Sequence, residues 1–169
     1  KLIEYEGKAK LVATPAREYN NYFKKIDLNS KATVEGKLKL CQLKHQDRAY
    51  RLKFDFKKTQ ASQFGVRLSN RHGEYVDICF DRNKQELRVD RRKSGIVDFN
   101  DKFPSVSVAP MSTAEMQSLT IILDRASVEC FSDIAAVSNL VFPTESYNHI
   151  ELYTSEGTTE INAEISRGK

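Results

Sequence analysis

The sequence lacks the long apolar run of a membrane protein, since no stretch approaches the ~20 consecutive apolar residues that a spanning helix needs. It also lacks a phosphate-binding loop: neither G-x-G-x-x-G nor G-x-x-x-x-G-K occurs, and the seven glycines are well separated. The G-x-S-x-G turn of serine hydrolases is missing too. We therefore expect no membrane span, no nucleotide cofactor and no serine nucleophile.

Histidine and cysteine are scarce, with three of each in 169 residues. No histidine pair has metal-ligand spacing, so we predict no metal site, and His72 is expected in a polar turn. The cysteines are far apart, odd in number and placed in strand-like runs, which favours small buried side chains over a disulfide framework. A single disulfide stays open among Cys41, Cys79 and Cys130.

Charge of one sign is not in excess, because 27 basic and 23 acidic residues leave a net charge of +4. The two signs interleave, and the densest basic cluster, residues 88–93, contains Asp90. A nucleic-acid-binding protein usually shows a basic stripe or a known motif, and neither is present. We therefore predict no nucleic-acid partner. The length indicates one domain, residues 1–169.

What the sequence does contain is alternation of apolar and polar residues. Residues 50–56 place Tyr, Leu, Phe and Phe at every second position, with charged residues between them. Residues 76–80 and 87–89 predict an antiparallel hairpin, and 119–123 and 128–131 predict another pair of strands. Such a series of short strands predicts an all-β fold, an antiparallel two-sheet β-sandwich of the jelly-roll or concanavalin-like kind.

Other segments give weaker signals. Short helical turns are expected to start at 15–18 and 112–116. A turn is predicted at 155–157, followed by a closing strand over 161–165. Residues 1–12 fit either a connector to a neighbour that precedes the domain or the first strand of the domain itself.

Carboxylates are the residues that could support catalysis, since glycosidases need two of them facing one cleft. The candidates flank or lie in strands: Asp77, Asp81, Asp90, Asp124 and Glu129. At strand ends, however, an Asp commonly caps the adjacent turn, which is the role we expect for Asp81, Asp90 and Asp124. Glu129 is expected to pair with an Arg of a neighbouring strand.

Two segments have a similar pattern. In each of them, a predicted strand ends in Asp-Arg and is followed by a small polar turn. They are Val89-Asp90-Arg91, followed by Ser94-Gly95 and Phe99, and Asp124-Arg125-Ala126-Ser127-Val128-Glu129-Cys130-Phe131. With the later Val141-Phe142-Pro143, they resemble the C-terminal sandwich module of glycoside hydrolase family 32, the family of invertases, levanases, inulinases and fructanases. The resemblance covers roughly residues 50–155. One departure is the turn Ser132-Asp133-Ile134-Ala135, where the family has a Gly, and this turn must be built differently.

The resemblance implies that the catalytic machinery lies elsewhere. Catalytic residues of the family lie on an N-terminal five-bladed propeller, in Asn-Asp-Pro, Arg-Asp-Pro and Glu-Cys motifs. The first two are absent here, and Glu129-Cys130 lies inside the sandwich's own strand motif. The resemblance therefore implies a non-catalytic module without a cofactor, whose partner is the propeller of the same parent protein. It also implies an extracellular or periplasmic location.

Three functions are weighed against each other. The first is an accessory module that stabilises the catalytic propeller. The second is a carbohydrate-binding module for fructan oligosaccharides such as levan or inulin, with Asp90, Arg91, Asp124 and Glu129 as ligands and Tyr75 as a platform. The third, an independent glycosidase, would need two carboxylates about 5–9.5 Å apart in one cleft.

Overall fold

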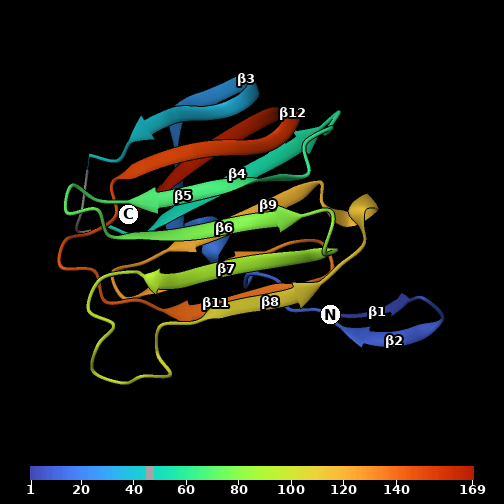
Figure 1. Cartoon of the computed structure of the whole chain (residues 1–169), viewed down its shortest axis with the longest axis horizontal. Coiled ribbons are helices and arrows are strands. Elements are labelled where there is room, and N and C mark those ends of the chain that lie inside the picture. The colour runs from blue at the N-terminus through green and yellow to red at the C-terminus, as the bar shows by residue number, and fades with distance from the viewer. Residues whose placement is uncertain (45–47) are drawn as a thin grey trace.

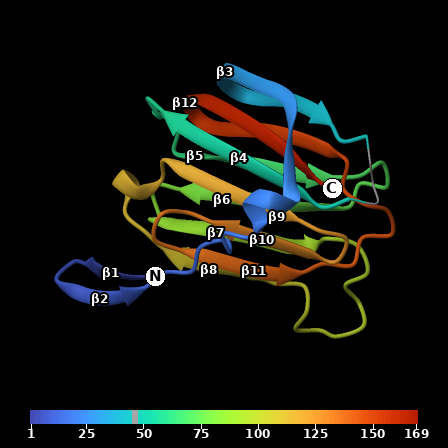
Figure 2. The same cartoon turned by 180° about the vertical axis from the view of Figure 1, so that it is seen from behind.

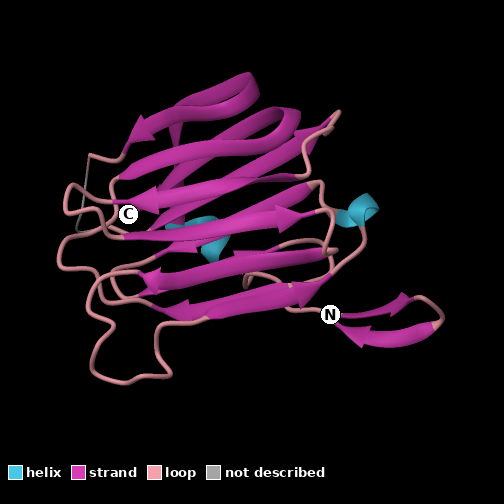
Figure 3. Cartoon of the chain, in the orientation of Figure 1, coloured by secondary structure: helices cyan, strands magenta, loops and turns pink. Residues whose placement is uncertain are grey.

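Strands account for nearly all regular structure in the chain, which confirms the all-β prediction (Figure 3). The computed structural model describes residues 1–44 and 48–169, with the backbone alone at 27–29, so His45 lies outside the described residues. Neither described helix is long and apolar enough to cross a membrane. In chain order the elements are β1 (Leu2–Tyr5), β2 (Lys8–Leu11), α1 (Tyr19–Tyr22), β3 (Phe23–Gln42), β4 (Tyr50–Lys57), β5 (Gln63–Ser69), β6 (Tyr75–Asp81), β7 (Glu86–Lys93), β8 (Val106–Pro110), η1 (Thr113–Glu115), β9 (Ser118–Leu123), β10 (Ser127–Phe131), β11 (Ala136–Leu140) and β12 (His149–Gly168).

The predicted elements are largely present. The predicted hairpin of β6 and β7 is confirmed, and its register places Ile78 opposite Val89 and Phe80 opposite Leu87. The paired strands β9 and β10 are also confirmed. The 3₁₀ helix η1 falls within the predicted turn at 112–116, whereas α1 starts one residue after the predicted segment 15–18.

The strands form two layers that share one continuous antiparallel sheet (Figures 1 and 2). One layer runs β5-β6-β7-β8 and the other runs β4-β9-β10-β11. They are joined because β12 pairs with β5 through residues 149–155 and with β4 through residues 160–167. Strand β3 follows β12 along its outer side and bends with it.

The prediction of a turn at 155–157 is wrong, because β12 continues through these residues without reversing its direction. The register with β3 shifts between Tyr153 and Thr158, and Glu156 and Gly157 have φ of 53° and 131°. An irregularity of this kind bends a strand without ending its pairing. The residues whose composition indicated a turn therefore form the bend at which β12 passes from one layer to the other.

The core fills the space between the two layers and is dominated by phenylalanines. Phe56 of β4 lies 4.9 Å from Phe64 of β5 and 5.8 Å from Phe80 of β6, between ring centroids. Phe64 and Phe80 are 5.3 Å apart. Because β4 belongs to one layer and β5 and β6 to the other, these rings hold the layers together. The apolar residues of the alternating segment 50–56 are thus part of the core.

The layers also meet at the edge opposite β12, where β8 and β11 lie side by side (Figure 1). Ser107 Oγ of β8 donates to Asn139 Oδ1 of β11 at 3.0 Å. Side-chain contacts of this kind close the sandwich into a nearly barrel-like shape.

Candidate functional site

The first resemblance segment ends β7 and ties it to the opposite layer. Arg91 donates from Nε to Ser105 Oγ at 3.1 Å and from Nη1 to the Leu140 carbonyl at 3.2 Å. Its guanidinium carbon lies 4.1 Å from the ring centroid of Phe103, a cation–π contact. Arg91 therefore fastens the loop that follows β7 to the end of β11.

The loop after β7 packs closely on the residues that follow β11. Ile96 N donates to the Phe142 carbonyl at 2.8 Å, and the Tyr147 hydroxyl donates to the Ser94 carbonyl. Gly95 has a φ of 125°, and a Cβ there would overlap the Phe142 carbonyl. The glycine of the Ser-Gly pair is therefore explained by close backbone packing.

The second resemblance segment reaches the same place from β9. Arg125 N donates to Asp124 Oδ1 at 2.7 Å, so the Asp caps the turn as predicted. Asp124 N donates to the Ser127 carbonyl at 2.9 Å, and Val141 N donates to the Ala126 carbonyl at 3.0 Å. Both segments therefore bind residues 140–143, which we call the junction segment.

The turn that departs from the family pattern is built on a serine. Ser132 Oγ accepts hydrogen bonds from Ala135 N at 3.0 Å and from Ile134 N at 3.4 Å. Ser132 N donates to the Ala135 carbonyl at 2.8 Å. None of residues 132–135 has a positive φ, so this turn needs no glycine.

Asp90 lies on the outer face of its layer and is engaged by its neighbour. Its carboxylate accepts hydrogen bonds from Arg92 N at 3.0 Å and from Arg92 Nη2 at 2.6 Å. Burial raises the pKa of Asp90, but the hydrogen bonds and charge of Arg92 outweigh it, so the pKa is lowered. Asp81, at the end of β6, caps the turn that follows it by accepting a hydrogen bond from Lys84 N at 2.9 Å. The capping predicted for Asp81 is therefore confirmed, whereas Asp90 lies inside β7 and accepts from Arg92 N of the same strand, so it caps no turn.

Tyr75 lies on the same outer face, beside an ion pair. Arg67 donates to Asp77 in a bidentate pair with distances of 2.8 and 2.7 Å. The Arg67 guanidinium carbon lies 4.2 Å from the Tyr75 ring centroid, and Lys93 Nζ lies 5.7 Å from it. The ring proposed as a sugar platform is thus already in contact with cations.

Glu129 lies on the other layer, in β10, opposite Ile122 of β9 and Ser138 of β11. The ion pair with an arginine that we predicted is not found among the described residues. The five candidate residues therefore fall into two groups, one on β6 and β7 and the other on β10 and the turn before it. The structure does not bring all five together.

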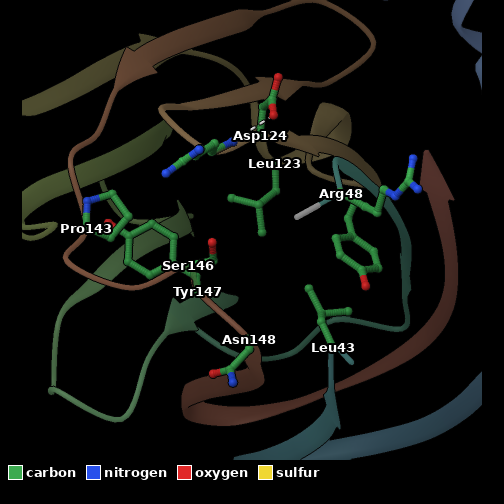
Figure 4. Close-up of a pocket in the computed structure, with 10 residues that line it drawn as sticks. Leu43, Arg48, Leu123, Asp124, Pro143, Ser146, Tyr147 and Asn148 are labelled. Atoms are coloured by element: carbon green, nitrogen blue, oxygen red, sulfur yellow. Dashed lines mark hydrogen bonds between the residues drawn. The ribbon is translucent and has the colours of Figure 1, made fainter. Parts of the chain in front are cut away.

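Asp124 borders a small cavity between β4, β9 and the segment before β12 (Figure 4). Leu43, Leu123, Tyr147 and Asn148 also line it, and its volume is about 30 Å³. That is close to the volume of one water molecule, whereas small-molecule sites have roughly 300–1,000 Å³. The cavity is too small for a sugar ring.

A larger pocket lies on the other side of Asp124, against α1. Its volume is about 430 Å³, and its walls include Glu18, Tyr19, Tyr22 and Ile122. Tyr19 and Tyr22 are 38% and 42% exposed, so their rings are open to solvent. The sequence analysis missed these residues, although the run from Glu18 to Phe23 contains three aromatic side chains.

The basic cluster at 88–93 is compensated by nearby carboxylates. Arg88 lies 3.6 Å from Glu86 and 4.0 Å from Asp81, and Arg92 pairs with Asp90 at 2.6 Å. Basic and acidic side chains, which alternate along this part of the sequence, therefore also lie close to each other in the structure.

The cysteines are free. Cys79 and Cys130 are buried, as predicted, whereas Cys41 is partly exposed. Burial raises the pKa of the Cys41 and Cys79 thiols to about 11, so both are protonated at neutral pH. His72 lies in a turn as predicted, 3.3 Å from Glu145. Within residues 1–44 and 48–169, no group of three or more His, Cys, Asp or Glu side chains is placed to hold a metal.

Proteins of known sequence and structure share this architecture. The chain is 28% identical over 121 residues to a levanase of Bacillus subtilis, covering 68% of this chain and 18% of that protein. It is 34% identical over 118 residues to an extracellular exo-inulinase of Aspergillus niger, covering 66% of this chain and 22% of that protein. The crystal structure of an exo-inulinase from Aspergillus awamori superposes with a TM-score of 0.86 at 27% identity, covering 99% of this chain and 34% of that one.

The chain thus spans about a fifth of the length of these curated relatives. Residues 13–167 match the family described as "Glycosyl hydrolases family 32 C terminal". That range contains both Asp-Arg segments and the junction segment that they bind. The chain therefore belongs to the C-terminal domain family of the family 32 glycosyl hydrolases.

Proposed function

We propose that this chain is the non-catalytic C-terminal module of an enzyme that cleaves fructosyl linkages, and that it stabilises the catalytic domain of that enzyme. The family match over residues 13–167 carries the proposal. The relatives named levanase and exo-inulinase support fructans as the substrate class of the parent enzyme. Two relatives are named as extracellular, which supports secretion.

The environment of the carboxylates supports a module without activity of its own. Asp81 and Asp124 each accept a hydrogen bond from a backbone N–H of their own turn, and Asp90 accepts one from Arg92 N within β7. Glu18 and Asp124 line one pocket, but both side chains are exposed. The acid of a glycosidase is typically buried in its cleft, and neither of these two carboxyl groups is buried.

The proposal is tested by removing residues 13–169 from the parent enzyme. We expect the truncated enzyme to unfold at a temperature lower than that of the intact enzyme by about 5 °C or more, because the surface that the module covers becomes exposed. The isolated 169-residue chain should release no fructose from levan, inulin or sucrose. An unchanged unfolding temperature would contradict the stabilising role, and fructose release by the isolated chain would contradict the non-catalytic one.

The second candidate function is fructan binding, and the pocket beside α1 is the observation that favours it. Exposed aromatic rings next to a few polar groups, in a cavity of about 430 Å³, fit the general form of a small-ligand site. Tyr19 and Tyr22 supply the rings, and Glu18 and Asp124 supply acceptors for sugar hydroxyls.

Calorimetric titration of the chain with levan and inulin oligosaccharides tests this second function. If the pocket binds sugar, Tyr22→Ala should abolish the saturable heat, while Phe99→Ala, an exposed aromatic residue elsewhere, should leave it unchanged. Loss of heat in Tyr75→Ala or Glu129→Gln instead would place the site on the residues predicted from sequence. No heat at millimolar sugar from the folded chain would exclude fructan binding.

A further inference from the structure

Strand β3 forms the edge of the sandwich beyond β12 (Figures 1 and 2). Its residues 23–34 pair with residues 159–168 of β12, and its residues 37–42 pair with residues 149–153. Because these two parts of β12 belong to different layers, the two halves of β3 lie on different layers as well. The two ends of β3 therefore come close to each other at one end of this edge.

A pocket of about 430 Å³ lies between the two ends of β3. Its walls are formed by residues 24–26 and 41–44, by Tyr50 of β4, and by Ile165 and Arg167 of β12. This volume is within the range of roughly 300–1,000 Å³ that is typical of small-molecule sites. The pocket is therefore large enough for a small organic ligand.

The inner wall of the pocket is apolar. Leu43, Tyr50 and Ile165 are buried residues of the core, and the partly buried side chains of Ile26 and Cys41 pack against that core. A ligand that covers this wall removes apolar surface from water, which favours binding. The wall therefore suits the hydrocarbon part of a ligand.

The remaining wall carries positive charge. Lys24, Lys25, Lys44 and Arg167 line the pocket, and no Asp or Glu lines it. Lys25 Nζ lies 3.3 Å from Glu164 Oε2, so its charge is compensated. In the part of the chain that the structure describes, the other three cations form no ion pair. Like charges around one pocket repel each other, and an anion bound among them relieves that repulsion.

We propose that this pocket binds an amphipathic anion, whose carboxylate or phosphate group pairs with Lys24, Lys44 and Arg167 while its short apolar body covers Ile26 and Ile165. Arginine and lysine are the side chains that pair with both kinds of anion. The ligand is a single dissolved molecule, because the apolar wall lies inside the pocket, where a flat membrane surface cannot reach it. A fructan has no charge, so this site is separate from the one considered beside α1 and does not depend on the proposed function.

Calorimetric titration of the 169-residue chain with octanoate, octyl phosphate and the neutral 1-octanol tests the proposal. We expect saturable heat from at least one of the two anions, and the tighter one identifies the preferred anionic group. Octanol should bind about tenfold more weakly or less, because it lacks the charge. The proposal is overturned if neither anion binds, if octanol binds as tightly, or if the chain binds phosphatidylglycerol vesicles but neither dissolved anion.

Charge-removing variants show whether the anion lies in this pocket. Lys24→Gln with Lys44→Gln should weaken binding of the anion by about tenfold or more. Lys37→Gln with Lys39→Gln is the matched control, because both lysines are exposed on β3 outside the pocket and the change in net charge is the same. At physiological salt the control should change the affinity by about twofold or less. Equal losses in the two double variants would contradict the pocket as the site.

Cys41 reports on the pocket without any change in charge. It lines the pocket and is partly exposed, whereas Cys79 and Cys130 are buried. Octanoate or octyl phosphate should therefore slow alkylation of Cys41 by the neutral reagent iodoacetamide, in proportion to the fraction of chain that has ligand bound. Mass spectrometry measures the modification, and Cys41→Ser should remove the signal. An alkylation rate that stays the same at saturating ligand would place the anion elsewhere and overturn the proposal.

Discussion

Replacing Phe64 by alanine is expected to lower the free energy of unfolding by about 3–5 kcal/mol. Phe64 is fully buried, and its ring lies 4.9 Å from Phe56 in the other layer and 5.3 Å from Phe80 beside it. Truncation removes the apolar surface of the ring and leaves a cavity that the two layers of the sandwich cannot readily collapse to fill. A single domain is stable by only about 5–15 kcal/mol, so this one change removes a large share of the stability.

Urea denaturation of the wild-type and variant chains measures the effect. Phe99→Ala is the control, because Phe99 is 57% exposed although its ring also contacts two others, at 4.6 and 5.7 Å. We expect a loss of about 1 kcal/mol or less for the control, since most of that surface is already in water. Similar losses for the two variants would show that Phe64 is not a central residue of the core.

Replacing Gly95 by alanine is expected to destabilise the chain by about 3 kcal/mol or more. Its φ of 125° is a conformation that L-residues avoid, and an added Cβ would also lie 2.5 Å from Pro143 Cα. Both effects act where the loop after β7 packs on the junction segment. The substitution should therefore separate two parts of the chain that are held together in the native structure.

Gly73→Ala is the control, at a glycine with a positive φ but without close packing. Gly73 has a φ of 75°, but a Cβ there would have no atom within 4 Å. We expect a loss of about 1 kcal/mol for this variant, from backbone strain alone. Thermal unfolding followed by circular dichroism compares the two, and equal shifts would show that close packing against the junction segment contributes nothing.

Local features of the fold could be predicted from the sequence. Alternation of apolar and polar residues identified β4, β6, β7 and β9 because successive side chains in a strand point to opposite faces. Capping by Asp81 and Asp124 was also predictable, because each carboxylate binds a backbone N–H within three residues of itself, whereas Asp90 lies inside β7 and caps no turn. The family resemblance depended on the same short segments.

Features that join distant residues could not be predicted in this way. The residues at 155–157 have the composition of a turn, yet β12 continues through them because β3 pairs with it on both sides of the bend. The pocket beside α1 forms because Tyr22 and Asp124, about a hundred positions apart in the chain, line the same cavity. The proposed sugar ligands on β7 and β10 were predicted as one set, but they lie on different layers.

By itself, then, the sequence determined several of the strands, among them β4, β6, β7, β9 and β10, with their apolar faces, two of the capped turns and the family. It did not indicate the long strand β3. The features that it did determine depend on interactions between residues that are near each other in the chain. The tertiary structure decided how β12 divides between two layers, how both Asp-Arg segments meet at the junction segment, and that residues 1–12 form a separate hairpin. Those outcomes depend on contacts such as Arg91 with Leu140 and Tyr5 with Glu115, which are 49 and 110 positions apart, and no local pattern encodes them.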